Sequence, residues 1–196
     1  MVKISEIETN RLILRQWLPS DYLPFSKLNA DLDVMKYYPN TLTESESNSF
    51  ANKIKTLISK RGWGFWAVVL KDGGCFIGFA GLHKPEVDLP FSPCVEIGWR
   101  LSKKYWGNGY ATEAAKAALE YAFEVLQLNE VVSFTSVKNI KSKSVMERLN
   151  MVNVMQNFEH PNIPVGHHLR EHVLYKITKA QWLDSMCDHK HRQTIP

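Results

Sequence analysis

The segment from Cys94 to Leu126 constrains the fold more than any other, because a predicted strand runs through two glycines into a predicted helix. Residues 95–101 alternate between apolar and polar or small types, which is typical of a strand with one buried face. From 111 to 126, alanines and a leucine recur with the spacing of one helix face. Gly107 and Gly109 lie between the two elements. Such a turn presents bare backbone N–H groups at a helix N-terminus, where phosphate binds well.

Three interpretations of this turn stay open from the glycines alone. It is a tight junction without a ligand, a dinucleotide-binding turn, or a seat for the pyrophosphate of coenzyme A. The dinucleotide fingerprint fits less well, because Thr112 stands at the place of a third glycine and no acidic residue closes the next predicted strand, 131–137. A Walker loop is excluded.

Length and composition indicate a single globular domain over residues 1–196, with an ordered core over about residues 8–185 and a basic C-terminal tail. The chain is 44% hydrophobic and 22% charged, and it has no apolar run long enough for a membrane span and no signal-peptide core. Its three cysteines lack metal spacing, which favours reduced thiols and a cytoplasmic location. A net charge of +4 without a dense basic run argues against nucleic acid as a partner.

The remaining pattern predicts a mixed α/β chain. Thr43 and Glu46 form a capping box that opens a helix running toward Ser59, and Asn139 is the predicted N-cap of another. Further helices are expected from Ser20 or Asp21 to Leu28 and at 181–183, and strands are expected at 11–17, 62–70, 75–82, 131–137 and 169–177. The strands before residue 102 form an antiparallel meander with a hairpin turn at 71–74, whereas 131–137 runs parallel to 95–101 because a helix joins them.

The run K-Y-W-G-N-G-Y-A-T-E at 104–113 resembles the acyl-CoA-binding motif of the GNAT superfamily of acetyl-CoA-dependent N-acetyltransferases, in the form typical of the RimJ/RimL-type branch. Lys104 replaces the Gln or Arg of that motif. Asn139, Ser142 and Glu147 match a second family segment, in which the usual Tyr is replaced by Met146. The resemblance runs from Thr9 to Tyr175. It implies the GNAT acyl-CoA N-acyltransferase fold, α/β with a mostly antiparallel sheet, a splayed central parallel strand pair that takes the pantetheine arm, and flanking helices.

The resemblance also implies a set of site residues. Glu96 is the candidate general base, directly or through a water, and Ser142 is the candidate proton donor to the leaving thiolate. His83 is a second candidate for the base, and Glu96 can equally be a satisfied structural carboxylate. The candidate acceptor-binding residues are His83, Trp66 and Tyr38, although aromatic residues in these positions also suit a core. The candidate cofactor-binding residues are Trp99, Arg100, Leu101, Lys104, Trp106, Gly107, Asn108, Gly109, Tyr110, Ala111, Thr112, Asn139 and Ser142.

The run H-L-R-E-H at 168–172 fits a zinc-peptidase motif, but that motif requires a helix. Here the alternation of Leu169, Glu171 and Val173 predicts a strand, on which residues four apart are about 13 Å from each other. Two ligands of one zinc need donor atoms much closer than this, so no metal is expected.

We therefore expect an acetyl-CoA-dependent N-acetyltransferase that acts by direct attack of a neutral amine in a ternary complex. The acceptor is a protein N-terminus or a small molecule such as an amino acid or an antibiotic, and the resemblance makes a homodimer possible. A non-catalytic acyl-CoA-binding regulatory module is the alternative of a different class.

Overall fold

A computed structural model describes residues 2–192 of the chain, and their side chains as far as residue 186. The chain forms two compact units. The first combines the residues up to Lys84 with Ile97–Ala118, and the second combines Pro85–Glu96 with the residues from Leu119 onward. The fold is mixed α/β as predicted, and its strand pairs are mostly antiparallel with one parallel pair. None of the helices within residues 2–192 is both long and apolar enough to cross a membrane.

The first unit is built on an antiparallel meander, as the sequence predicted. Register pairs such as Leu14 with Val68 and Val68 with Gly78 join three successive strands. Its strands are β1 (Ile7–Glu8), β2 (Leu12–Arg15), β3 (Phe65–Leu70), β4 (Phe76–His83) and β5 (Glu96–Leu101), of which β5 starts with the last residue of the second unit. The predicted first strand, 11–17, is shortened at both ends, and β1 was not predicted. Residues 71–74 form the hairpin turn.

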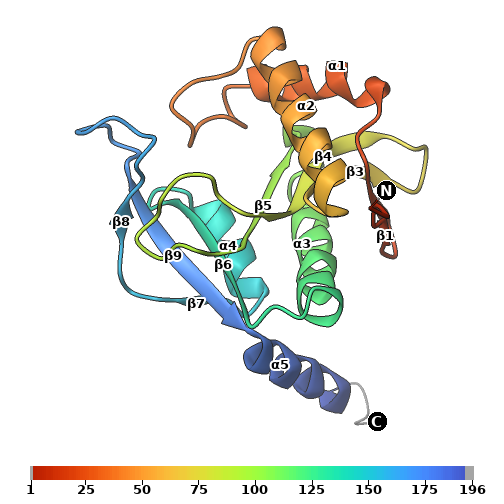
Figure 1. Cartoon of the computed structure of the whole chain (residues 1–196), viewed down its shortest axis with the longest axis vertical. Coiled ribbons are helices and arrows are strands. Elements are labelled where there is room, and N and C mark those ends of the chain that lie inside the picture. Colours follow the sequence, from red (N-terminus) through yellow and green to blue (C-terminus); the bar gives the residue numbers. More distant parts are fainter. Residues whose placement is uncertain (1, 193–196) are drawn as a thin grey trace. The chain divides into compact units, whose positions relative to one another are not determined.

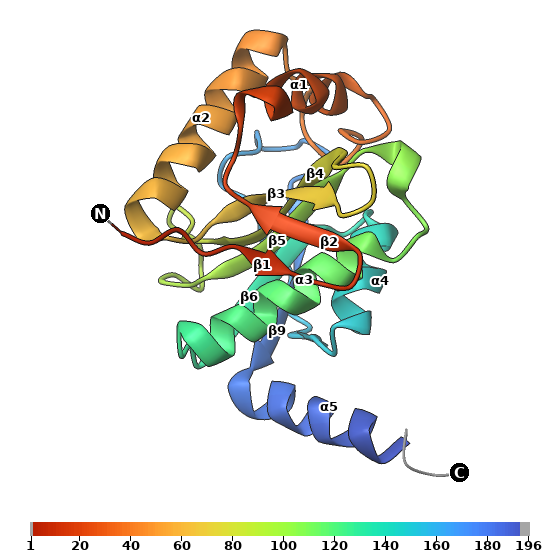
Figure 2. The ribbon, with the colours of Figure 1, turned by 90° about the vertical axis from the view of Figure 1, so that its right-hand side faces the viewer.

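Two helices, α1 (Tyr22–Ala30) and α2 (Glu44–Arg61), cover one face of these strands, and α3 (Tyr110–Glu120) covers the other (Figures 1 and 2). The predicted capping box starts α2, because the Thr43 hydroxyl accepts from Glu46 N while Glu46 accepts from Thr43 N at 2.8 Å. The helix runs past the predicted end to Gly62, whose φ of 83° closes it in the left-handed conformation. Short 3-10 helices precede α1 and follow β5: η1 (Pro19–Asp21) and η2 (Lys103–Tyr105).

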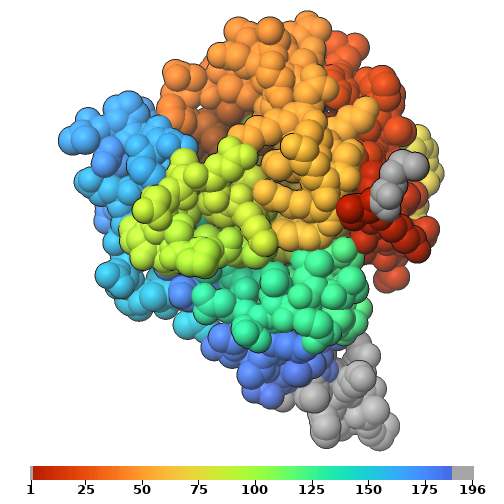
Figure 3. Space-filling view, viewed as in Figure 1, coloured from red at the N-terminus to blue at the C-terminus, as the bar shows by residue number. Residues whose placement is uncertain are grey.

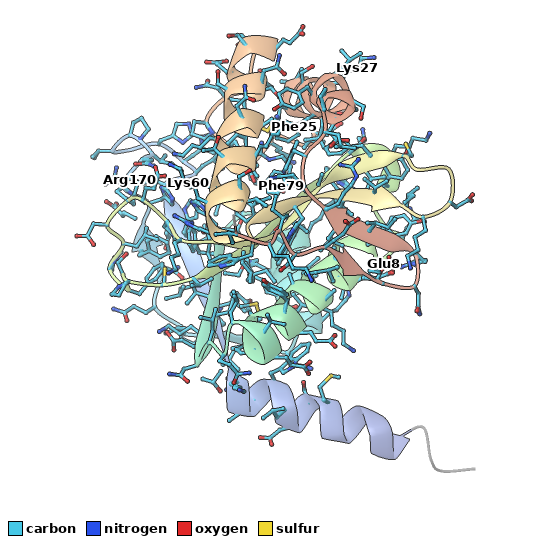
Figure 4. The ribbon with its side chains drawn as sticks, turned by 45° about the vertical axis from the view of Figure 1, so that its right-hand side comes forward. Glu8, Phe25, Lys27, Lys60, Phe79 and Arg170 are labelled. Atoms are coloured by element: carbon cyan, nitrogen blue, oxygen red, sulfur yellow. The ribbon has the colours of Figure 1, made fainter. Side chains whose placement is uncertain are left out.

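The core of the first unit lies between the strands and α1 and α2. Phe25 from α1 and Phe79 from β4 point toward one another there, with ring centroids 6.0 Å apart (Figure 4). Trp17 packs edge-on against Phe25, and Leu12 and Leu14 of β2 are also fully buried. These side chains fix the two helices on the sheet, and so hold the face of β5 that looks toward them.

The second unit contains the predicted parallel pair and a long antiparallel pair. Glu96 of β5 pairs in parallel with Val132 of β6, whereas β6 and β9 pair antiparallel over seven positions, from Glu130 with Thr178 to Ser136 with His172. The elements are β6 (Glu130–Ser136), β7 (Val152–Asn153), β8 (Phe158–Glu159), β9 (Glu171–Thr178), α4 (Ile140–Arg148), α5 (Lys179–Arg192) and the π-helix η3 (Tyr121–Val125). Both two-residue strands, β7 and β8, were not predicted.

Two helix ends in this unit follow the sequence closely. Asn139 caps α4, because its Oδ1 accepts from Ser142 N at 3.3 Å. Asn150 takes the left-handed conformation, with φ of 58°, after that helix, a conformation that asparagine adopts more readily than most residues other than glycine. The last helix differs from the prediction: 181–183 is only part of α5, and the basic stretch Asp188–Arg192 lies within it.

Candidate active site

The turn between β5 and α3 has the conformation that its glycines allow. Gly107 and Gly109 both have φ of 78°, which side-chain-bearing residues rarely adopt. A Cβ added to Gly107 would meet nothing within 4 Å, so the space above the turn is open. Asn108 folds back, and its Nδ2 donates to the carbonyl oxygens of Trp106 at 3.1 Å and Tyr105 at 3.3 Å. The Asn108 side chain therefore braces the turn, and the side toward which a Cβ on Gly107 would point stays uncovered.

The first N–H groups of α3 face no acceptor in the described part of the chain. The helix starts at Tyr110, and its first intrahelical bond runs from Glu113 N to Gly109 O at 3.0 Å. The N–H groups of Tyr110, Ala111 and Thr112 precede that bond, and no described side chain caps them. Three free donors at the positive end of a helix dipole form a site for an anion.

A contact missed in the sequence fixes the entrance to this helix. Glu113 accepts from the Thr9 hydroxyl at 2.6 Å, from Arg11 N at 2.9 Å and from Arg11 Nε at 2.7 Å. Burial raises the pKa of Glu113, but these bonds and the Arg11 charge outweigh it and hold the pKa below its usual value. The Arg11 guanidinium lies 4.5 Å from the Tyr110 ring centroid, and its Nη2 lies 3.5 Å from where a Cβ on Gly109 would be. A cation thus stands beside the turn.

The end of β5 is joined to the turn by Trp106. The indole Nε1 of this residue donates to Leu101 O at 2.8 Å, so one lone pair of that carbonyl is already used. Arg100 is buried, whereas Trp99 is half-buried. Lys104 Nζ lies 5.5 Å from the Tyr105 ring centroid, and its neighbour Lys103 is paired with Asp33 at 2.6 Å.

In the second unit, Asn139 and Ser142 are in contact. Asn139 Nδ2 donates to Ser142 Oγ and to Thr135 Oγ1, both at 3.0 Å. The Ser142 oxygen therefore accepts a hydrogen bond, and its own proton is left to donate elsewhere. Met146, at the place of the family Tyr, is 1% exposed and belongs to the core of this unit.

The carboxyl group of Glu96 is strongly perturbed. The residue is partly exposed to solvent, but its carboxyl group lies deep among protein atoms. This burial raises the pKa of Glu96 from 4.5 to about 8. No ion pair or hydrogen bond contributes to this shift. The carboxyl group is therefore mostly protonated at pH 7 and becomes a proton acceptor as the pH rises toward 8.

The three candidate acceptor-binding residues lie in different environments. Trp66 is fully buried and its Nε1 donates to Ser5 O at 2.8 Å, so its ring has no exposed surface with which to contact an acceptor. His83 stacks on Phe65 with centroids 5.3 Å apart, and both line a cavity of about 120 Å³ in the first unit. Tyr38 is 38% exposed and covers the guanidinium of Arg100.

The H-x-x-E-H stretch lies partly in a strand, as its alternation indicated. Glu171 and His172 are the first residues of β9, whereas His168 lies in the turn before it. His172 and His160 are neighbours, with ring centroids 5.0 Å apart among phenylalanines. Among the described residues, no group of three or more His, Cys, Asp or Glu side chains is placed to hold a metal.

Comparisons with known proteins agree with this geometry. The profile of the acetyltransferase (GNAT) domain family matches residues 11–152. The chain is 31% identical over 177 residues, 90% of its length and 98% of the relative's, to YnaD, an uncharacterized N-acetyltransferase of Bacillus subtilis (strain 168). It is 33% identical over 164 residues, 80% of its length and 69% of the relative's, to FsC-acetyl coenzyme A-N(2)-transacetylase of Aspergillus fumigatus.

A solved structure shares the fold. The GNAT-family acetyltransferase from Bacillus anthracis superposes with a TM-score of 0.75 and 29% sequence identity, over 90% of this chain and 99% of that one. Fold, turn and sequence therefore define one class of protein, the acyltransferases of the GNAT fold. The chain belongs to the GNAT acetyltransferase family.

Proposed function

We propose that this protein transfers an acetyl group from acetyl-CoA to an amine, with the pyrophosphate of the cofactor seated on the turn between β5 and α3. The observation that carries the proposal is the open turn itself. Gly107 and Gly109 hold the left-handed conformation, and three N–H groups of α3 lack an acceptor among the described residues. Arg11, which is paired with Glu113, stands beside this seat.

The residues present fit the cofactor along its length. The N–H groups of Tyr110, Ala111 and Thr112 would hold the phosphates. The pantetheine amides would pair with the backbone of β5 at Trp99 to Leu101. Asn139 and Ser142 are the residues that the family resemblance assigns to the same arm. Lys104 and Trp106 would flank the phosphates. Acetyl-CoA, when bound, supplies an acetyl thioester that is activated toward nucleophiles.

Glu96 would take the proton that the acceptor nitrogen loses as it forms its bond to the acetyl carbon. An α-amine, with a pKa of about 7.7–8.0, is far easier to deprotonate near neutrality than a lysine side chain at about 10.4. A base whose pKa is about 8 matches an α-amine closely. A protein N-terminus and a small α-amino compound are therefore both suitable acceptors, and His83 is the second candidate for the base.

Ser142 would provide the hydrogen bond that the leaving sulfur needs when its bond to the acetyl carbon breaks. Its Oγ already accepts from Asn139, which orients the hydroxyl proton away from that partner. Met146 cannot donate a proton, whereas Ser142, four residues before it on α4, carries a hydroxyl that can.

The proposal is tested by acetyl-CoA binding to a variant whose turn is filled. Gly107→Trp places a large side chain above a turn that now has open space. Gly73→Trp is a matched control, because Gly73 has φ of 73°, also has nothing within 4 Å and lies in a different turn, the hairpin at 71–74. Both substitutions cost about 1–3 kcal/mol of backbone strain. We expect calorimetry to show acetyl-CoA affinity reduced about a hundredfold or more by Gly107→Trp only, since several charge-assisted bonds are lost.

Two other results would overturn the proposal. Folded wild-type protein that does not bind acetyl-CoA would leave the fold without this function, and equal affinity in both variants would remove the cofactor from the turn. Binding without transfer to any of a panel of N-terminal peptides and small amines would instead favour the regulatory module.

A further inference from the structure

Arg100 is a buried cation held by neutral groups. Its side chain is 9% exposed and lies between β5, α1 and α2 of the first unit. Nη1 donates to Asn29 Oδ1 at 2.6 Å, and Asn29 Nδ2 donates in turn to Ser47 Oγ at 2.8 Å. Asn29 and Ser47 are fully buried. This chain of hydrogen bonds fixes the guanidinium in one orientation but brings no negative charge to it.

The charge of Arg100 is uncompensated within the described residues, none of whose carboxylates forms an ion pair with it. Its Nε is buried without a hydrogen-bond partner. Three rings surround the guanidinium carbon, with centroids at 4.1 Å for Tyr38, 5.4 Å for Phe79 and 5.6 Å for Phe50. Aromatic faces offset only part of the cost of burying a cation, and they give no acceptor to Nε. A buried charge of this kind normally has an anionic partner.

The unused edge of the guanidinium has the shape that a carboxylate fits. Asn29 occupies Nη1, which leaves the N–H bonds of Nε and Nη2 parallel along the opposite edge. A carboxylate accepts two parallel hydrogen bonds from such an edge, and a lysine ammonium cannot reproduce that geometry. We propose that Arg100 binds a carboxylate of the amine acceptor, so that the natural acceptor is a small amine that also carries a carboxylate.

The neighbouring cavity supports an acceptor of this chemistry. The Phe50 ring lies beside the Arg100 guanidinium and also lines the cavity of about 120 Å³, together with Phe65 and His83. Lys53 and Arg61 in its lining are basic, and no lining residue is acidic. Apolar walls with basic groups suit an acceptor with an apolar body and a negative charge. Tyr38 belongs to the segment between α1 and α2 that lies at the surface in Figure 3 (orange), so the ring covering Arg100 borders solvent.

The inference rests on the proposed acetyl transfer and adds that the acceptor must carry a carboxylate. The experiment uses matched pairs of amines, each an amino acid or dipeptide and its carboxamide, and measures kcat and KM for acetylation by the full chain. Wild type should prefer the carboxylate member about thirtyfold or more in kcat/KM, which is the usual cost of leaving a buried charge unpaired. The preference should appear in KM.

Three variants separate ligand binding from a structural role. Arg100→Met should abolish the preference by raising KM for the carboxylate member much more than for the carboxamide. Arg100→Lys keeps a buried cation under Tyr38 and should keep the fold, yet it should lose most of the preference because the paired N–H edge is gone. Lys103→Met is the control, because Lys103 is exposed and paired with Asp33, and it should leave the preference unchanged.

The outcomes distinguish this inference from the proposed function. Equal kcat/KM for both members of every pair, with acetyl-CoA binding intact, would refute the role of Arg100 and leave acetyl transfer standing. A carboxylate preference that survives Arg100→Lys and Arg100→Met would place the carboxylate elsewhere. Preference for N-terminal protein segments over small amines would refute the small acceptor. Loss of acetyl-CoA binding in wild type would refute the proposed function itself.

Discussion

Replacement of Glu96 by glutamine tests the buried carboxyl group in two independent ways. The side chain of glutamine has almost the same shape as that of glutamic acid and cannot ionise. Burial raises the pKa of Glu96 from 4.5 to about 8, so the folded protein prefers the neutral form. Glu96→Gln makes that neutral form permanent, and it therefore changes stability and catalysis in opposite directions.

The stability effect has a definite sign and pH window. Between pH 4.5 and about 8, the folded protein keeps a proton that the unfolded chain releases, so the contribution of Glu96 falls as the pH rises. It is complete below pH 4.5 and lost above about 8. The two pKa values differ by an amount worth up to about 5 kcal/mol. We expect Glu96→Gln to be more stable than wild type by about 1 kcal/mol at pH 5 and by 4–5 kcal/mol, about the full difference, at pH 9.

Urea unfolding of both proteins at pH 5, 7 and 9 measures this gap. Glu130→Gln is the control, because Glu130 lies on the neighbouring strand β6, is exposed and forms only a 3.3 Å pair with Lys176. Its substitution should change the free energy of unfolding by less than about 1 kcal/mol at every pH. A gap for Glu96→Gln that does not widen with pH would refute the reasoning, because the carboxyl group would then not be held neutral by burial.

The catalytic effect follows from the same ionisation. Acetyl transfer should rise with pH and level off above about 8, since only the ionised carboxylate accepts a proton. Glu96→Gln should lower kcat about a hundredfold to ten-thousandfold and remove this limb of the profile, with acetyl-CoA affinity unchanged. Activity that is retained together with the rising limb would assign the base to another group, and His83→Gln would then be the next variant to measure.

Two further predictions concern the second unit. Burial and the nearby His172 lower the pKa of His160 to about 4, so the unfolded state binds a proton more readily than the folded state as the pH falls below 6.5. The free energy of unfolding of wild type should therefore fall by up to about 3 kcal/mol by pH 4. In the same urea titration, that of His160→Gln should fall by less. Burial and nearby carboxylates raise the pKa of Cys94 to about 11, whereas Cys75 is exposed. In a Cys187→Ser protein, iodoacetamide at pH 8 should modify Cys75 and leave Cys94 unmodified, which mass spectrometry would measure. Equal labelling of the two cysteines would contradict the burial of Cys94.

Much of the fold could be predicted from local sequence because its boundaries depend on local chemistry. The capping box at Thr43, the glycine turn at 71–74 and the Asn139 cap each need only a few consecutive residues. The two-residue strands β7 and β8 could not be predicted, because two residues carry no periodicity. The π-helix that follows the alanine-rich α3 likewise has no local signal in its own five residues, Tyr121–Val125.

In the candidate site, too, the parts made by consecutive residues could be predicted, and the parts made by residues distant in the chain could not. The phosphate seat is made of backbone N–H groups and glycine conformations, so a short motif describes it almost completely. The surroundings of Arg100 are made by Asn29, Tyr38 and Phe79, which are more than 20 residues distant in the chain, and the sequence analysis named Arg100 only as a cofactor-binding residue. Trp66 shows the converse, because an aromatic residue expected at the acceptor is taken up by the core.

The strand β5 concentrates groups that are costly for folding. Glu96, Gly98 and Arg100 alternate along it, so their side-chain positions share one face, with about 13 Å between the first and last Cα atoms. A Cβ on Gly98 would come within 3.3 Å of Phe65, the ring that stacks on His83. One end of this face carries an acid held neutral by burial, and the other carries a buried cation without an anion. A sequence selected for stability alone would replace both, so each is better explained by the role proposed for it above, Glu96 as a base and Arg100 as a carboxylate-binding residue.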